Sequence, residues 1–208
     1  MSNVVLISPD EKMLLCEAGD RIPLSIVYLA ASLKRSKHNP ILADLNHMSY
    51  RGLNKKLKKA DFVGITTITP NYSWAINFAK HLRHNFPRIK LIAGGPHATV
   101  APETLTQYYD YVVVGEGERA IVDIVEGKVK DKIVRYPYEE NLDNLPIPFN
   151  EIGMEKYGMN QDGHRTITML TSRSCNYTCC FCTKDILGKK QRFHSIDRAI
   201  KEIKLIKN

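Results

Sequence analysis

The sequence predicts an α/β fold, a doubly wound parallel sheet of the flavodoxin or Rossmann kind, over residues 1–127. Short apolar runs rich in branched residues, without polar–apolar alternation, indicate strands buried on both faces of a parallel sheet. Segments with helical spacing separate these runs, and such alternation implies right-handed crossovers with helices on both faces. Five strands suit a flavodoxin-like order, although the sequence alone does not fix that order.

The elements are expected in the following order along the chain. The strands are Val4–Ile7, Ile41–Ala43, Phe62–Thr66, Lys90–Ala93 and Tyr111–Val114. Apolar residues at helical spacing predict one helix through Ile22, Ile26, Leu29 and Leu33, and another through Trp74, Phe78 and Leu82. The last helix of this domain begins at Glu118 and gathers Ile121, Ile124 and Val125 on one side.

The segments that follow the expected strands carry prolines, threonines and glycines. In open α/β sheets the ligand crevice lies beyond the carboxyl ends of the strands, and glycine lets a backbone approach a ligand closely. Any one of these loops is better explained as a tight turn, but four of them converge on one edge of the sheet, which favours a ligand site. We therefore expect a ligand site built from Pro9, Thr66, Thr67, Gly94, Gly95, Pro96, His97, Gly115, Glu116 and Gly117.

Residues 128–165 are expected to form a linker, because prolines and a polar stretch break the periodicity. A second unit is expected over residues 166–208, with a strand at Thr166–Leu170, a cysteine-rich loop and a helix from about Ser195 to Lys207. Ser195 is a suitable N-cap, and the apolar face of that helix is Ile196, Ile200, Ile203 and Ile206. One strand, one loop and one helix cannot bury a core, so we expect this unit to be incomplete.

Composition narrows the class of protein. The chain has 208 residues, of which 43% are hydrophobic and 25% charged. It has no apolar run near the roughly 20 residues of a membrane span and no secretory signal, so a cytoplasmic location is expected. The formal net charge of +8 is interpreted as solvated helix faces, because no aromatic residues are interleaved with the lysines. A nucleic-acid partner is therefore not expected.

Four of the five cysteines lie close together, at Cys175, Cys179, Cys180 and Cys182. Such clustering favours a metal site over a disulfide framework, whereas the isolated Cys16 is expected to be a small buried hydrophobe or a bystander. Taking Cys175, Cys179 and Cys182 as ligands gives C-x3-C-x2-C. Three thiolates can hold three irons of a cubane cluster and leave the fourth iron open to a substrate. The alternative is a zinc site with Cys180 or His194 as its fourth ligand.

The C-x3-C-x2-C motif, with Phe181 before its last cysteine, resembles the signature of radical-SAM enzymes. The resemblance implies a [4Fe-4S] cluster on Cys175, Cys179 and Cys182, whose open iron is chelated by the amino and carboxylate groups of S-adenosylmethionine. In that family, reductive cleavage of this cofactor releases a 5′-deoxyadenosyl radical. The resemblance also implies that Phe181 lies near the adenine and that residues 166–208 begin a partial TIM barrel.

Segments of the N-terminal region resemble the cobalamin-binding domains that are fused to radical-SAM domains. These segments are Pro23–Leu33, Asp61–Thr66, Gly94–Thr99 and Val114–Glu118, and Leu145–Pro148 is similar to the linker of that family. The resemblance covers nearly the whole chain and implies that residues 1–127 bind cobalamin through the loop residues named above. The Asp-x-His-x-x-Gly loop that ligates cobalt from below is absent, and Asp44–His47 does not match it. This argues against histidine ligation more than against cobalamin.

The resemblance implies methyl transfer or radical rearrangement on an unknown substrate. The implied partners are small-molecule cofactors and an electron donor such as ferredoxin or flavodoxin. Because the family's barrel needs several more βα units, we expect the chain to be truncated after the first. Two alternatives stay open, a truncated non-catalytic cobalamin-binding module and a zinc-binding basic protein that binds nucleic acid.

Overall fold

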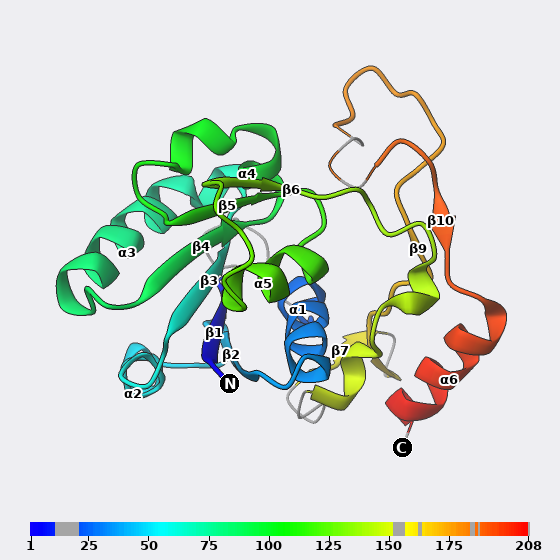
Figure 1. Cartoon of the computed structure of the whole chain (residues 1–208). Helices are drawn as coiled ribbons and strands as arrows, with labels where there is room; N and C mark the ends of the chain where they lie inside the picture. The colour runs from blue at the N-terminus through cyan, green and yellow to red at the C-terminus, as the bar shows by residue number, and fades with distance from the viewer. Residues whose placement is uncertain (11–20, 152–156, 162–163, 184–185, 187, 208) are drawn as a thin grey trace.

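The computed structural model describes residues 1–10, 21–151, 157–161, 164–183, 186 and 188–207, so Cys16 lies outside the described residues. Within these ranges the centre is a six-stranded parallel sheet with the order β2-β1-β3-β4-β5-β6 (Figure 1). Its strands are β1 (Asn3–Ser8), β2 (Asn39–Asp44), β3 (Phe62–Thr66), β4 (Lys90–Gly94), β5 (Tyr111–Val114) and β6 (Ile133–Arg135). The first five correspond to the predicted strands, and their order is the flavodoxin-like one, which the sequence suited but did not fix.

Helices cover both faces of the sheet, which confirms the doubly wound class. One face carries α1 (Leu24–Arg35) and α5 (Glu118–Val125), and the other carries α2 (Tyr50–Leu57), α3 (Tyr72–Asn85) and α4 (Pro96–Val100). Val4 and Leu6 of β1 belong to the core under α1 and α5, and Val5 and Ile7 belong to the core under α2, α3 and α4. Because successive strand residues face opposite sides, two buried faces require strands that are apolar throughout. Among the described residues, no helix combines the length and apolar character needed to cross a membrane.

The strand order reverses at β1, which lies between β2 and β3. Connections that leave two neighbouring strands in opposite directions open a crevice beyond their carboxyl ends. The loops at this edge include the single 3-10 turns η2 (Thr69–Asn71) and η3 (Pro102–Leu105). Thr67 ties two of them together, because its N–H and its hydroxyl both donate to the carbonyl of Gly94, at 2.7 and 2.8 Å.

The region beyond α5 contains more regular structure than the sequence predicted. β6 lies inside the expected linker and pairs in parallel with β5. Two antiparallel pairs follow, β7 (Met159–Gln161) with β8 (His164–Thr166) and β9 (Ser172–Arg173) with β10 (Arg192–Phe193). The single turns η4 (Leu142–Asn144) and η5 (Pro148–Glu151) lie between β6 and β7.

The strand predicted at Thr166–Leu170 is wrong beyond its first residue, because β8 ends at Thr166 and β9 begins at Ser172. The intervening apolar residues cover the α/β domain instead. Ile167 and Met169 pack against the core under α1 and α5, and Leu170 packs against the cluster that contains Tyr28. Packing against an existing core removes these apolar side chains from water, so they do not need a neighbouring strand to be buried.

The last helix, α6 (Ile196–Lys207), begins where the sequence predicted. Ser195 caps it, because its hydroxyl oxygen accepts the N–H of Arg198 at 3.2 Å. Only part of the expected apolar face is buried, since Ile206 packs on the core while Ile196, Ile200 and Ile203 are exposed. Polar anchors hold the helix in addition, among them the Arg198 guanidinium, which donates to the carbonyl of Leu145 at 2.7 Å.

Candidate functional site

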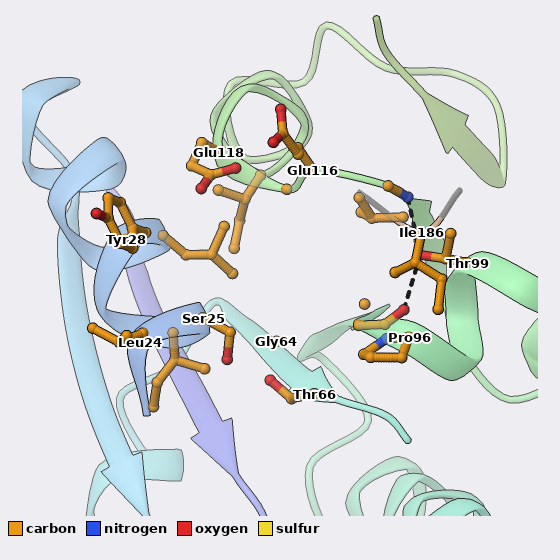
Figure 2. Close-up of a pocket in the computed structure, with 18 of the residues that line it drawn as sticks. Leu24, Ser25, Tyr28, Gly64, Thr66, Pro96, Thr99, Glu116, Glu118 and Ile186 are labelled. Carbon is orange, nitrogen blue, oxygen red and sulfur yellow. Dashed lines mark hydrogen bonds between the residues drawn. The ribbon is translucent and has the colours of Figure 1, made fainter. Parts of the chain in front are cut away.

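A largely apolar cavity of about 420 Å³ lies at the carboxyl ends of β1, β3, β4 and β5. Figure 2 shows residues of α1 on one side of it, Pro96 and Thr99 on the other, and Gly64 and Thr66 of β3 between them. The C-terminal region completes the lining with Leu170, Ser172, Arg173, Ser174 and Ile186. The cavity therefore lies between the α/β domain and the segment that carries the cysteines.

Glycines create much of this space. A side chain at Gly64 would bring its Cβ to 3.0 Å from Cδ2 of Leu6, whereas a Cβ at Gly94 would meet no atom within 4 Å. Gly95 and Gly115 have φ angles of +97° and +83°, which favour glycine over other residues. Thr99 braces their loops, because its hydroxyl donates to the carbonyl of Gly95 and accepts the N–H of Gly115, both at 3.0 Å.

Most of the loop residues predicted to bind a ligand line this cavity. They are Thr66, Gly94, Gly95, Pro96, Gly115, Glu116 and Gly117. Pro9, Thr67 and His97 do not line it. The ring of His97 is held by hydroxyls, with Nδ1 at 3.1 Å from Thr69 Oγ1 and Nε2 at 3.1 Å from Thr104 Oγ1. Burial lowers the pKa of His97, and its two hydroxyl contacts connect η2 to η3.

Residues of α1 and of the C-terminal region also line the cavity, although none of them was predicted to contact a ligand. Leu24, Ser25, Tyr28 and Leu29 of α1 lie along the cavity. Tyr28 is 2% exposed, and its ring lies under the guanidinium of Arg173 at 5.0 Å from the ring centroid. Burial and the charge of Glu202 raise the pKa of Tyr28 to about 12. An apolar stripe on a helix has the same sequence signal whether it faces a sheet or a cavity.

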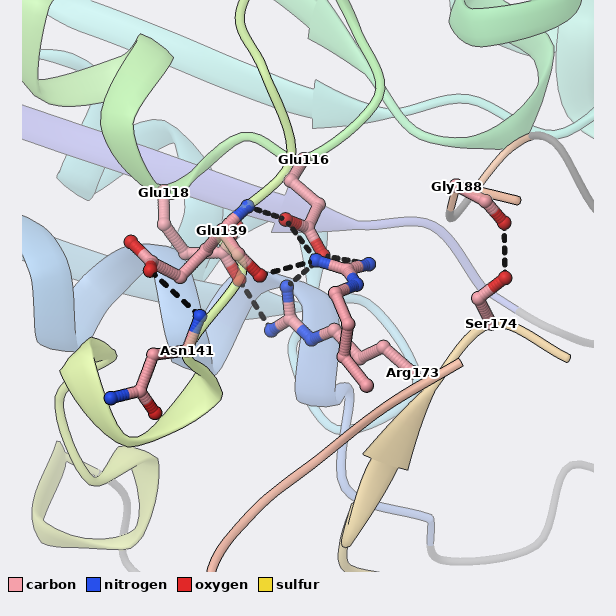
Figure 3. Close-up of polar contacts among 8 residues, drawn as sticks. Glu116, Glu118, Glu139, Asn141, Arg173, Ser174 and Gly188 are labelled. Atoms are coloured by element: carbon pink, nitrogen blue, oxygen red, sulfur yellow. Dashed lines mark hydrogen bonds and ion pairs between the residues drawn. The ribbon is translucent and has the colours of Figure 1, made fainter. Parts of the chain in front are cut away.

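Beside the cavity lies a buried ion cluster that we define as Glu116, Glu118, Arg173 and Arg192 (Figure 3). Arg173 donates to Oε1 of Glu116 at 2.9 Å and to Oε1 of Glu118 at 2.6 Å. Arg192 donates to both carboxylate oxygens of Glu116, at 3.0 and 3.1 Å. It also donates to the carbonyl of Glu139 at 2.6 Å. The cluster joins the β5–α5 loop to both strands of the β9–β10 pair.

The charges in this cluster stabilise one another. Burial alone would raise the pKa of Glu116, but hydrogen bonds and positive charge from Arg192 and Arg173 hold it below its ordinary value. Burial alone would lower the pKa of Arg173, and the carboxylates of Glu118 and Glu116 raise it instead. Two carboxylates face two guanidinium groups, so the cluster has no net charge.

The cysteine segment lies between β9 and β10 and extends away from the sheet (Figure 1). Cys175 is partly buried, whereas Cys179, Cys180 and Cys182 are exposed. The N–H of Cys182 donates to the carbonyl of Cys179 at 3.1 Å, and Phe181 is 88% exposed. In the described part of the chain, no three histidine, cysteine or acidic residues are grouped so that they could hold a metal ion. The three thiols have the chemistry of cluster ligands, but this loop conformation does not bring them together as a site.

Within the described ranges, the zinc alternative also lacks an assembled ligand set. The His194 side chain is 1% exposed, and its Nδ1 lies 3.2 Å from Oδ1 of Asp143. Asp143 Oδ1 also accepts the N–H of Ser195 at 3.0 Å, so His194 and the start of α6 share one carboxylate. This arrangement gives His194 a structural role at the base of α6.

Comparison with known proteins decides the family. The B12 binding domain family matches residues 12–125, which span the sheet from the first crossover to α5. The chain belongs to the B12-binding domain family. This B12-binding domain forms the greater part of the cavity, and the predicted resemblance of the N-terminal region to cobalamin-binding domains is confirmed.

Proteins similar to most of this chain include a methyltransferase and a cyclase. An uncharacterized methyltransferase, PH0819 of Pyrococcus horikoshii, is 31% identical over 212 residues, which cover 88% of this chain and 45% of that protein. The anaerobic magnesium-protoporphyrin IX monomethyl ester cyclase of Rubrivivax gelatinosus is 26% identical over 219 residues, covering 91% of this chain and 40% of that one. This chain thus spans less than half the length of these curated relatives.

A solved structure shares the fold. OxsB, a cobalamin-dependent S-adenosylmethionine radical enzyme with aqua-cobalamin and S-adenosylmethionine bound, superposes with a TM-score of 0.79 at 18% identity. The match covers 99% of this chain and 31% of OxsB. The fold of nearly the whole chain is therefore shared with that structure.

Proposed function

We propose that this chain binds a corrinoid in the cavity at the carboxyl ends of β1, β3, β4 and β5. The observation that carries the proposal is the glycine-lined cavity at the point where the strand order reverses, inside the region that matches the B12-binding family. Open α/β sheets bind their ligands at this position. The apolar lining and the bare backbone at Gly64 and Gly94 suit a flat, largely apolar group such as the benzimidazole base of cobalamin.

The residues of the chain would hold the corrinoid without a histidine ligand to cobalt. None of the residues lining the cavity in the described ranges is a histidine. His47, in the turn that follows β2, lies edge-on to Tyr157 with ring centroids 5.2 Å apart. When bound, the corrinoid would supply a cobalt able to carry a methyl group. The glycines of the loops would contribute backbone contact, and Leu24 and Leu29 would exclude water from its apolar part.

We further propose that Cys175, Cys179 and Cys182 bind a [4Fe-4S] cluster that coordinates S-adenosylmethionine. The support is the spacing of the cysteines and the likeness of the whole chain to OxsB. Reduction of such a cluster requires an electron donor such as ferredoxin or flavodoxin. The reaction class that these cofactors support is methyl transfer or radical rearrangement, and the substrate is not assigned.

Titration with hydroxocobalamin, followed through its visible spectrum, tests the corrinoid site. We expect saturable binding by the wild-type chain. Gly94→Leu places a side chain in the open space and should weaken binding at least about tenfold, a loss of ~1.4 kcal/mol. Gln107→Leu adds the same side chain at an exposed position before the amino end of β5 and should bind like wild type. Absence of binding by the wild-type chain, or equal binding by Gly94→Leu, would refute the assignment.

Anaerobic reconstitution with iron and sulfide tests the cysteine site. Serine at Cys175, Cys179 or Cys182 should abolish cluster formation, whereas Cys180→Ser is the matched control and should retain it. The electron paramagnetic resonance spectrum of the reduced cluster should change when S-adenosylmethionine is added. An unchanged spectrum would rule out an open iron that binds this cofactor. Loss of the cluster in Cys180→Ser would instead support a different ligand set.

A further inference from the structure

The strongest feature outside the proposed binding residues is the way in which the base of the cysteine loop is attached to the α/β domain. β9 and β10 close this loop, and their register places Arg173 directly opposite Arg192. Like charges at directly opposed positions of an antiparallel pair destabilise it. Both side chains are also buried, at 8% and 3% exposure. The pair therefore needs an anion from elsewhere in the protein.

Glu116 supplies that anion. Its Oε1 accepts hydrogen bonds from both guanidinium groups, at 2.9 Å from Arg173 and 3.0 Å from Arg192. Among the contacts of the described residues, Glu118 accepts from Arg173 of β9, whereas Glu116 accepts from both Arg173 and Arg192 and so contacts both strands. The remaining oxygen of Glu116 accepts the N–H of Glu139 at 2.9 Å and a second bond from Arg192. A single carboxylate thus holds the two strands and the segment before η4 together.

Packing contacts join the same parts of the chain as these ion pairs. The ring of Tyr138 lies close to both Gly115 and Gly188. A Cβ added at Gly115 would lie 3.2 Å from this ring, and a Cβ added at Gly188 would lie 3.1 Å from it. The guanidinium of Arg192 lies over the same ring, 5.3 Å from its centroid. Gly115 belongs to the loop that lines the cavity, and Gly188 belongs to the cysteine segment. Tyr138 therefore touches both the corrinoid side and the cysteine side of this contact.

Glu116 also lines the cavity, next to Gly115 and Gly117. Figure 2 places Glu116 and Glu118 at the edge of the cavity where α5 begins, and Figure 3 shows the Arg173 guanidinium meeting the same two carboxylates. Arg173 is itself part of the lining and lies two positions before Cys175. A ligand in the cavity would therefore bury and order the groups that fix the base of the cysteine loop.

We propose that Glu116 is a positioning residue that couples occupancy of the cavity to the order of the cysteine loop. The inference rests on the proposed corrinoid site. A ligand that stabilises the Gly115–Glu118 loop favours the ion cluster, and the cluster favours the β9–β10 pair at the base of the loop. By linkage, an ordered loop strengthens binding in the cavity by the same factor. Without Glu116, Arg192 loses its carboxylate partner in the cluster and faces the positive charge of Arg173, so the connection between the two strands and the cavity loop is weakened.

Hydrogen exchange of the full chain, read by mass spectrometry over residues 171–174 and 191–194, tests this coupling. In wild type, saturating hydroxocobalamin should slow exchange in both segments at least about fivefold, the lower end of typical site-to-site coupling. Glu116→Gln keeps the shape of the side chain and should exchange faster without ligand and lose the ligand effect. Glu103→Gln makes the same change at an exposed glutamate of η3 and should behave like wild type.

Two further variants separate coupling from simple loss of structure. Glu118→Gln leaves Arg192 paired with Glu116, so it should retain a measurable ligand effect and serves if Glu116→Gln does not fold. Combining Glu116→Gln with Arg192→Gln removes the excess positive charge, and we expect it to restore slow exchange in the absence of ligand. Rescue by the second substitution is a result that general destabilisation would not give.

The outcomes distinguish this inference from the proposed function. Binding of hydroxocobalamin to wild type with unchanged exchange in both segments overturns the coupling and leaves the corrinoid site standing. Failure of wild type to bind overturns both the corrinoid site and the coupling. In that case, hydrogen exchange without ligand still tests whether Glu116 attaches the cysteine loop to the α/β domain. Equal exchange rates in Glu116→Gln and Glu103→Gln would show that it does not.

Discussion

Gly94 and Gly95 are adjacent at the end of β4, yet alanine at each position should change stability in opposite directions. Gly95 has φ +97° and ψ −174°, a combination that only glycine adopts readily. A Cβ there would also lie 2.8 Å from the carbonyl oxygen of Thr67, a backbone atom that cannot rotate away. Strain of this kind costs about 2–3 kcal/mol, so Gly95→Ala should lower the free energy of unfolding by at least that amount.

Gly94 presents the opposite situation. A Cβ at this position would have no atom within 4 Å, and its φ lies outside the left-handed region. Replacing such a glycine with alanine restricts the unfolded chain and stabilises the fold by about 0.4–1 kcal/mol. The two neighbouring alanine variants should therefore differ by roughly 3 kcal/mol in unfolding free energy.

Urea denaturation of the full chain measures this difference, and thermal unfolding provides a second reading. For a chain of this size, each kcal/mol shifts the midpoint by about 2–4 °C, so Gly95→Ala should melt at least about 4 °C below wild type. Gly94→Ala should melt at or slightly above wild type and should bind hydroxocobalamin more weakly than wild type. Equal destabilisation by both alanines would refute the conclusion that Gly94 borders open space and Gly95 a fixed backbone.

Three other predictions follow from single contacts. Because the folded-state pKa of Glu116 is lowered, its stabilisation is present above the ordinary carboxyl pKa of about 4.3 and is lost as the pH falls through the folded pKa. Acidification should thus reduce the urea midpoint of wild type more than that of Glu116→Gln, and parallel curves would contradict this. Ser195→Ala removes the cap of α6 and should cost about 1 kcal/mol by urea denaturation, with an unchanged midpoint arguing against the cap. Tyr109→Phe removes the hydroxyl that donates to the carbonyl of Ala75 at 2.9 Å. It should lower the free energy of unfolding by about 1 kcal/mol, and a urea unfolding curve identical to that of wild type would contradict this.

The sheet could be predicted from the sequence because its strands are buried on both faces. Phe62–Thr66 and Tyr111–Val114 begin and end where the apolar runs do. The same logic misassigned residues 167–170, since apolar residues that cover a core and apolar residues in a strand look alike in a short run. β6 was missed because three residues carry little pattern of their own, and the strand exists through its pairing with β5.

The part of the candidate site that the loops after the strands form could be predicted from the sequence. Glycines after β4 and β5 carry a local signal, because their backbone conformations exclude most other residues. The ion cluster carries none. Glu116 is 57 positions from Arg173 and 76 from Arg192, and a single charged residue at such a separation has no recognisable spacing. Only the folded arrangement of β9 and β10 against the β5–α5 loop shows that these charges meet.

The short strand β6 determines where the chain can be cut to produce an isolated B12-binding domain. An exposed strand edge presents unpaired N–H and C=O groups that recruit other chains into aggregates. β6 covers the outer edge of β5 by pairing Ile133 with Val112, Val134 with Val113 and Arg135 with Val114. A B12-binding domain cut at residue 127 would keep every helix of the α/β unit and lose this protection. A cut beyond Arg135 would retain the whole sheet, so we expect the solubility of the isolated domain to depend on the eight residues 128–135, none of which lines the cavity.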